Sequence, residues 1–155
     1  MGAELHLVDE HAAVGEFKDA MSALAAGVVL VVTSVDGRLW GTTVTSFASV
    51  SADRPTVAVS LLTDSTAARA IKRSGWFGVL VLGAHQVELA RRCAAPGAAK
   101  FLGPDAFVGA LAMLGCSVVR ALAVEDHTLL IARVRTAHAP DRPAAPLVYH
   151  RRGYR

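Results

Sequence analysis

Residues 41–55, GTTVTSFASVSADRP, are the stretch that decides the fold. They carry six hydroxyl side chains within ten residues that otherwise have the composition of a β-strand. In an extended chain, successive side chains alternate between the two faces. Val44, Ala48 and Val50 then share one face, and Phe47 lies on the other among most of the hydroxyls. The pattern predicts a strand lined with neutral hydrogen-bond donors. These donors are Thr42, Thr43, Thr45, Ser46, Ser49 and Ser51.

Two interpretations of this strand follow from its chemistry. A row of hydroxyls beside an aromatic ring suits a ligand that is flat, polar at its edges and anionic at one end. Flavin mononucleotide (FMN) fits that description. The alternative is an exposed strand rich in Thr and Ser, because β-branched Thr favours strands and Ser tolerates their ends. The strand alone leaves both open.

The flanking sequence predicts further strands joined by tight turns. The valine-rich residues 28–34 are typical of a buried strand, and Asp36-Gly37 is a strong hairpin signal that leads into the hydroxyl-rich stretch. About seven mostly antiparallel strands at this spacing favour a barrel over a doubly wound sheet. Further strands are expected over 56–62, 76–82, 128–136 and 147–150, and around residues 116–119 within 111–122.

Short helices accompany the strands. Residues 66–73 form a helix capped by Asp64 or Ser65 and stopped at Ser74-Gly75, and residues 85–93 form another. Residues 14–26 place apolar side chains on one helical stripe, with Gly27 as the stop. The stripe comprises Val14, Phe17, Met21, Leu24 and Ala25.

Length and composition limit the class of protein. The 155 residues predict a single domain over 1–155, with residues 1–13 as a flexible lead. A hydrophobic content of 53% suggests an oligomer interface, because monomers rarely expose large apolar patches. No apolar run approaches the roughly 20 residues that a membrane-spanning helix needs. The acidic N-terminus does not resemble a secretory signal. We therefore expect a cytoplasmic protein.

Charge and motifs argue against several classes of site. The net charge is +3, and three arginines fall within residues 150–155, so the rest of the chain is close to neutral. The sequence has no stripe of basic residues interleaved with aromatics, the pattern typical of nucleic-acid binding proteins, so nucleic acid is disfavoured as a ligand. Cys93 and Cys116 form neither a CxxC pair nor a metal-ligand spacing, and we expect them to be reduced and buried. The sequence contains no GxGxxG motif after a predicted strand and no Walker loop, so a nucleotide would have to bind without either of these phosphate-binding loops.

In their order along the chain, several segments resemble the flavin reductase family with the FMN-binding split-barrel fold. These are the small reductases of two-component flavin monooxygenases. The resemblance runs from about Phe17 to Arg155. It rests on ALAAGVVLVVTSVDGRLWG, TVTSFASVSADRPTVAVSL, STAARAIKRSGWFGVLVL, the Gln86–Arg92 helix, Lys100-Phe101, EDHTLLIARV and LVYHRRGYR.

The resemblance implies a fold, an assembly and a reaction. The fold is a mostly β, antiparallel, Greek-key-like split barrel with short helices, paired as a homodimer. The reaction is hydride transfer from NADH or NADPH to bound FMN or FAD, and the reduced flavin passes to a partner monooxygenase. Because this chemistry belongs to the cofactors, the protein must stack nicotinamide against isoalloxazine.

The resemblance also implies site residues. Ser65 and Thr66 open a helix whose free N–H groups favour a phosphate, although simple capping explains them as well. His127 is expected at the nicotinamide site, and His150 in the segment that closes over it; a solvated turn and tail are the alternatives. The implied flavin-binding residues are Thr43, Thr45, Ser46, Phe47, Ser49, Val50, Ser51, Ser65, Thr66, Lys100 and Phe101.

One departure from the family keeps other functions open. Only LGPDAFV, residues 102–108, separates Lys100-Phe101 from Gly109, a loop shorter than in most relatives. Because this loop commonly borders the active site in the family, its shortening places the nicotinamide site in more doubt than the flavin site. Two alternatives therefore stand beside the reductase. One is a flavin carrier or partner subunit without free turnover, and the other is a split-barrel homologue that catalyses another, biosynthetic, reaction.

Overall fold

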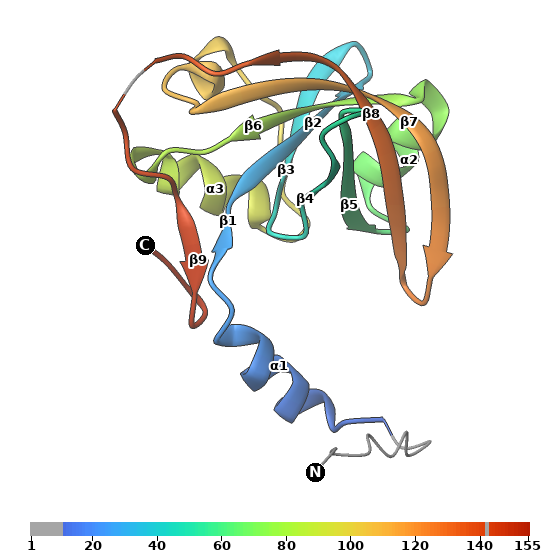
Figure 1. The fold of residues 1–155 in the computed structure, drawn as a ribbon, viewed down its shortest axis with the longest axis vertical. Coiled ribbons are helices and arrows are strands. Elements are labelled where there is room, and N and C mark those ends of the chain that lie inside the picture. Colours follow the sequence, from blue (N-terminus) through green and yellow to red (C-terminus); the bar gives the residue numbers. More distant parts are fainter. Residues whose placement is uncertain (1–10, 142) are drawn as a thin grey trace.

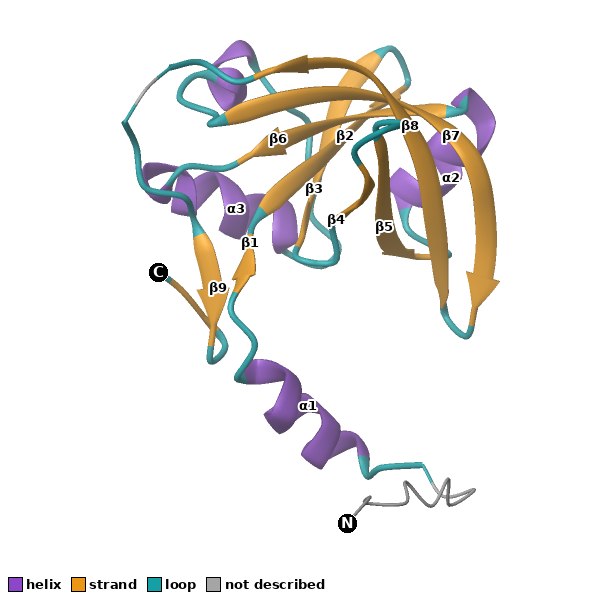
Figure 2. Cartoon of the chain, viewed as in Figure 1, coloured by secondary structure: helices purple, strands orange, loops and turns teal. Residues whose placement is uncertain are grey.

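A seven-stranded antiparallel sheet forms the body of the protein (Figures 1 and 2). The computed structural model describes residues 11–141 and 143–155, so most of the predicted lead over residues 1–13 lies outside the described residues. In their order across the sheet, the strands are β3 (Arg38–Val44), β2 (Val29–Val35), β6 (Trp76–Val81), β7 (Ala112–Val124), β8 (His127–His138), β5 (Thr56–Leu62) and β4 (Ala48–Ser51).

The two edge strands of this sheet are consecutive in the chain. Only Thr45–Phe47 separates β3 from β4, so the sheet must curl until its opposite edges approach each other. The Ser46 hydroxyl donates to the Ser60 carbonyl of β5 at 2.7 Å, which holds the crossing segment across the gap. The predicted antiparallel split barrel is confirmed. The prediction of one continuous hydroxyl-rich strand was wrong, because its two halves pair with different strands, β2 and β5, at opposite edges of the sheet.

A smaller sheet joins the two ends of the described chain. It contains β1 (Ala26–Gly27), β9 (Val148–His150) and β10 (Gly153–Tyr154). Helix α1 (Val14–Ser22) ends before Leu24 and Ala25, earlier than the pattern predicted. Gly27 is not its stop but a strand residue paired with Val148. The cause is a pairing across the length of the sequence, which local periodicity does not reveal.

The other helices begin and end close to their predicted signals. In α2 (Thr66–Ser74), the Ser65 hydroxyl accepts the Ala68 N–H at 3.1 Å, and Gly75 stops the helix with φ +74°. Helix α3 (Val87–Ala94) follows a 3₁₀ turn at Ala84–Gln86, and a second such turn covers Pro104–Phe107. No helix in the described parts of the chain has the length and apolar character to cross a membrane.

Both faces of β2 are buried, which explains its valine-rich sequence. Val29 and Val31 belong to the core inside the barrel, where Phe77 is fully buried beside α2 residues. Leu30 and Val32 belong to a second core on the opposite face, under α3. An edge strand with one wet face would instead alternate apolar and polar residues.

The free edges of the sheet are short or covered. Along the outer edge of β3, the Gly41 N–H donates to the Lys100 carbonyl at 2.9 Å, and the Leu102 N–H donates to the Leu39 carbonyl at 2.9 Å. The other edge strand, β4, has four residues and a register shift between Ser49 and Ser51. Pairing along β3 therefore brings Lys100 to the split of the barrel.

The Thr33 hydroxyl predicts a simple gain in stability. It is fully buried and has no hydrogen-bond partner within the described residues. Since an unsatisfied buried hydroxyl costs roughly 1–3 kcal/mol, Thr33→Val should raise the free energy of unfolding by about 1 kcal/mol. Thr128→Val is the matched control, because that hydroxyl is equally buried but lies 3.0 Å from the Thr63 hydroxyl. We expect the control to destabilise in the same urea titration; a loss in both variants would contradict the prediction.

Candidate functional site

A cavity of about 910 Å³ opens at the split of the barrel. Its walls come from β3, the end of β5, the start of α2, the segment 93–100 and the C-terminal hairpin. Its size lies within the range of roughly 300–1,000 Å³ that small-molecule sites occupy.

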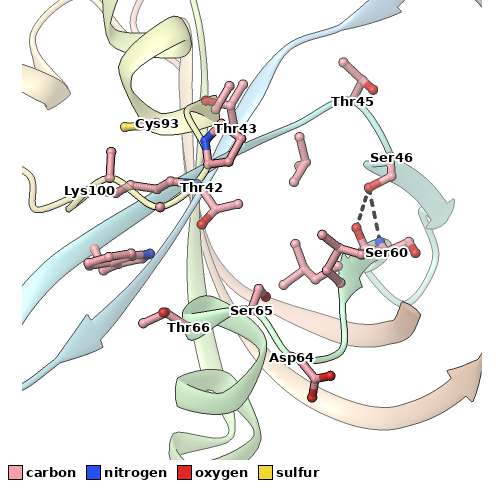
Figure 3. A pocket seen from close by; sticks show the side chains of 18 of the residues that line it. Thr42, Thr43, Thr45, Ser46, Ser60, Asp64, Ser65, Thr66, Cys93 and Lys100 are labelled. Atoms are coloured by element: carbon pink, nitrogen blue, oxygen red, sulfur yellow. Dashed lines mark hydrogen bonds between the residues drawn. The ribbon is translucent and has the colours of Figure 1, made fainter. Parts of the chain in front are cut away.

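Two predicted ligand-binding hydroxyls are already engaged with the protein. The Thr43 hydroxyl donates to the Ala90 carbonyl of α3 at 2.7 Å, and Ser46 bonds to Ser60 as described above. Both residues line the pocket, as does Thr45. Thr42 is a further hydroxyl in the wall, and Figure 3 shows it on β3 facing Ser65 at the start of α2. The Thr43 bond therefore fixes β3 to α3, whereas Thr42 faces the cavity.

One end of the pocket is suited to an anion. Ser65 and Thr66 line it at the N-terminus of α2, where N–H groups and the helix dipole favour negative charge. Lys100 lines it too, and among the described lining residues it is the one Lys or Arg. Asp64, beside Ser65, adds a single carboxylate. The walls of the pocket thus offer an anion a helix N-terminus and one lysine.

Aromatic side chains form other parts of the wall. Trp40 lines the pocket and is held by Phe101, whose ring meets it edge-on with centroids 5.1 Å apart. The Arg38 guanidinium covers the Phe101 ring at 3.8 Å, a cation–π contact. Tyr149 and Tyr154 also line the pocket, with ring centroids 5.2 Å apart. Burial raises the pKa of the Tyr154 phenol. These rings offer flat apolar surface to a flat ligand.

His127 lies at the rim of the pocket, where β8 begins. Its Nδ1 atom is 2.7 Å from Asp126 Oδ1, and this hydrogen bond lowers the pKa of the Asp126 carboxyl. When Nδ1 donates to Asp126, Nε2 is the ring nitrogen left to meet a ligand. The pair thus orients the imidazole without burying it.

The turn that carries His127 predicts a second gain in stability. Glu125 has φ +51°, a left-handed conformation that costs a non-glycine residue roughly 1 kcal/mol. Glu125→Gly should therefore stabilise the protein by about 0.5–1 kcal/mol in thermal or chemical unfolding. Asp36→Gly, at φ +50° in the β2–β3 turn, is the control; because Asp tolerates this region better, its gain should be smaller. Equal effects would argue against strain at Glu125.

Other predicted site residues lie away from the cavity. Phe47 packs against the barrel core, Phe101 supports Trp40, and Ser49, Val50 and Ser51 follow β4 outside the pocket. His150 follows Tyr149 in β9 and so points to the opposite face. The short 102–108 segment also lies elsewhere; it covers the β3 edge and the second core. The predicted residues that line the cavity are Thr43, Thr45, Ser46, Ser65, Thr66, Lys100 and His127.

Several lining residues were missed by the sequence analysis. Thr42 was counted among the donors of the strand but not among the implied flavin-binding residues; it shares its strand face with Trp40 and Val44, so alternation from the tryptophan could have placed it in the pocket. Tyr149 and Tyr154 stand in the recognised C-terminal segment, but only their pairing across β9 and β10 shows that both face one cavity. No local signal marks the others. These are Ser60, Asp64 and the loop residues Pro96, Gly97, Ala98 and Ala99.

The thiols of the protein are free and buried. Cys93 lines the pocket, and burial raises its pKa; burial raises the pKa of Cys116 to about 11. Both therefore remain protonated at neutral pH. No cluster of three or more His, Cys, Asp or Glu side chains in the described residues is arranged to hold a metal ion.

Comparisons with known proteins agree with this geometry. The family model described as flavin reductase like domain matches residues 21–155. An NADH:riboflavin 5'-phosphate oxidoreductase of Streptomyces pristinaespiralis is 33% identical, over 89% of this chain and 85% of that protein. The reductase component of a 4-nitrophenol 4-monooxygenase/4-nitrocatechol 2-monooxygenase of Rhodococcus opacus is 33% identical, over 88% and 77%.

A solved structure gives the same result. The styrene monooxygenase flavin reductase of Pseudomonas putida S12 superimposes with a TM-score of 0.79 at 29% identity, covering 90% of this chain and 96% of that one. A pocket lined by a helix N-terminus, one lysine and aromatic rings thus occurs at the split of an antiparallel barrel whose sequence and fold both match these reductases. The protein belongs to the flavin reductase like domain family.

Proposed function

We propose that this protein is an NADH-dependent flavin reductase that supplies reduced flavin to a partner monooxygenase. The pocket at the barrel split carries this conclusion, because it joins a cationic end to aromatic walls in a cavity of about 910 Å³. Relatives named as NADH:flavin oxidoreductases and as reductase components support the reaction and the partner.

The residues present fit a flavin phosphate at one end of the pocket. Lys100, Ser65 and Thr66 would hold the phosphate, through a charge-assisted bond and the free N–H groups of α2. Thr42 and Thr45 are placed to meet the polar edge or side chain of the flavin. When bound, the flavin supplies the hydride-accepting chemistry.

The remaining pocket residues position the second substrate. We propose that His127, oriented by Asp126, contacts the nicotinamide from the rim. Tyr149 and Tyr154 cover the opposite opening and limit the access of water. A protein that holds the nicotinamide ring against the isoalloxazine ring accelerates hydride transfer between them mainly by orienting the two rings. His150, on the far face of β9, has no role in this arrangement.

We further propose a cytoplasmic homodimer. Free thiols at Cys93 and Cys116 suit a reducing compartment, where NADH is also found. Assembly is supported by exposed apolar residues on α1, where Phe17 is 58% exposed and no residue is buried. Such a stripe on a surface helix is stable in water only when another surface covers it.

The direct test is NADH or NADPH oxidation by purified protein with added FMN or FAD. We expect turnover that saturates with flavin and is faster with NADH. Protein that binds FMN tightly but does not oxidise either nicotinamide would contradict the reductase and favour a carrier. Protein that binds neither flavin would instead favour a different substrate in the same pocket.

A further inference from the structure

Helix α1 stands away from the barrel, yet it is tied to a wall of the pocket (Figure 1). The Arg152 guanidinium forms an ion pair with the Asp19 carboxylate, and the Arg151 N–H donates to the Ser22 carbonyl at 2.8 Å. Arg151 and Arg152 form the turn between β9 and β10. The helix therefore touches the C-terminal hairpin at its tip.

That turn is strained, so its contacts with α1 matter. Arg151 and Arg152 have φ +47° and +60°, and a two-residue turn of this kind is normally built from Asn and Gly. A non-glycine residue in this region costs roughly 1 kcal/mol. Strained conformations persist where surrounding contacts hold them. Besides the β9–β10 pairing that flanks the turn, the described contacts of its two arginines come from α1.

The same hairpin presents the tyrosines of the pocket. Tyr149 and Tyr154 lie opposite each other across β9 and β10, and both line the cavity. On its other side, Tyr149 pairs with Ala26 of β1, which follows α1 in the chain. A change in the position of α1 is thus transmitted to the tyrosines by two routes, the ion-paired turn and the β1 strand.

A second copy of this chain is the partner that fits α1. The long β7–β8 hairpin and α1 extend from the same side of the barrel, as Figure 1 shows. The outer half of the β7–β8 hairpin exposes Val119, Leu122 and Val124, all of which are more than 45% accessible. One chain thus carries both an apolar helix stripe and an apolar strand surface. Two copies related by a two-fold axis can cover both surfaces at once.

We propose that α1 docks on a second copy and that this contact fixes the Tyr149–Tyr154 wall, so that flavin binding and dimerisation are coupled. The inference rests on the proposed function, since it assigns a flavin to the pocket. Coupling of two binding equilibria is reciprocal. Because a dimer carries two pockets, saturating FMN must tighten the dimer by the square of the factor by which dimerisation tightens FMN binding at each pocket.

The test measures both factors on the full chain. Sedimentation velocity with and without FMN gives the dimer dissociation constant, and quenching of flavin fluorescence above and below that concentration gives FMN affinity. We expect the FMN affinity of each pocket to rise about fivefold or more on association, the usual scale of coupling between sites, and the dimer dissociation constant to fall by the square of that factor. A monomer at all concentrations, or a dimer whose FMN affinity does not change with association, would overturn the proposal.

Variants separate the docking contact from its link to the pocket. Phe17→Ser with Met21→Ser should give a monomer whose FMN affinity equals that of the dissociated wild type. Asp19→Ala should leave the dimer intact and lower the coupling factor, and Asp19→Arg with Arg152→Asp should restore it. Glu16→Ala, on the same helix with no ion pair in the described residues, is the matched control and should change neither constant.

The outcomes also distinguish this proposal from the proposed function. Normal NADH turnover with FMN affinity that is independent of protein concentration overturns the coupling alone. Failure to bind FMN at any concentration overturns both. If α1 of a monomeric chain becomes protected from proteolysis only when a monooxygenase is added, the helix docks on that partner and the second-copy assignment is wrong.

Discussion

Replacing Lys100 by alanine should raise the dissociation constant for FMN about 10- to 100-fold, because a hydrogen bond to a charged group contributes about 1.5–3 kcal/mol. Lys100 is the one Lys or Arg that lines the described pocket. Riboflavin lacks the phosphate, so its affinity should change by less than about twofold, within the small effect of a surface substitution. Fluorescence titration of both ligands measures the difference.

The choice of ligands makes the Lys100 result specific. Lys72→Ala removes an exposed lysine from the last turn of α2, outside the pocket, and should change neither affinity. An equal loss for FMN and riboflavin would place Lys100 beside the isoalloxazine instead. No loss for either ligand would move the phosphate to another part of the cavity.

Phe77→Ala should remove most of the stability of the protein. Phe77 is fully buried at the centre of the barrel core, and truncation of such a residue costs roughly 3–5 kcal/mol. The total stability of a domain is only about 5–15 kcal/mol. Urea unfolding measures the loss. Its neighbour Trp76, 41% exposed, is the control, and Trp76→Ala should cost clearly less. Similar losses in the two variants would show that the core had relaxed around the cavity.

The elements set by local signals were predicted closely. The strand expected over 56–62 is β5, and the Ser65 cap and Gly75 stop both hold for α2. The Asp36-Gly37 signal also lies in the β2–β3 turn, where both residues have positive φ. Each of these depends on a few neighbouring side chains, which are visible in the sequence.

The errors have a common physical cause in pairing over long range. Helix α1 ends early because Ala26 and Gly27 pair with β9. The hydroxyl-rich stretch breaks into β3 and β4 because its halves join opposite edges of one sheet. The partner strands β2 and β5 are neighbours of the stretch in sequence, but the strands that separate them in the sheet, β6, β7 and β8, come later in the chain, so periodicity within the stretch could not reveal the break.

The same break explains which of the predicted site residues line the cavity. The density of hydroxyls was interpreted as a set of ligand donors, but Thr43 and Ser46 donate to backbone carbonyls that hold the split together. Residues beyond the crossing, Ser49 to Ser51, follow β4 away from the cavity. The family resemblance, confirmed by the match over residues 21–155, located the region, whereas individual roles depended on the closure of the barrel.

The covered edges of the sheet have a further consequence, for aggregation. An exposed strand edge offers unpaired N–H and C=O groups to any other chain, and natural proteins avoid this by covering or shortening such edges. Here Lys100 and Leu102 occupy bonds along β3, while β4 is short and irregular. The chain can therefore expose the apolar stripe of α1 while its sheet edges offer little template for the indiscriminate strand addition that leads to fibres.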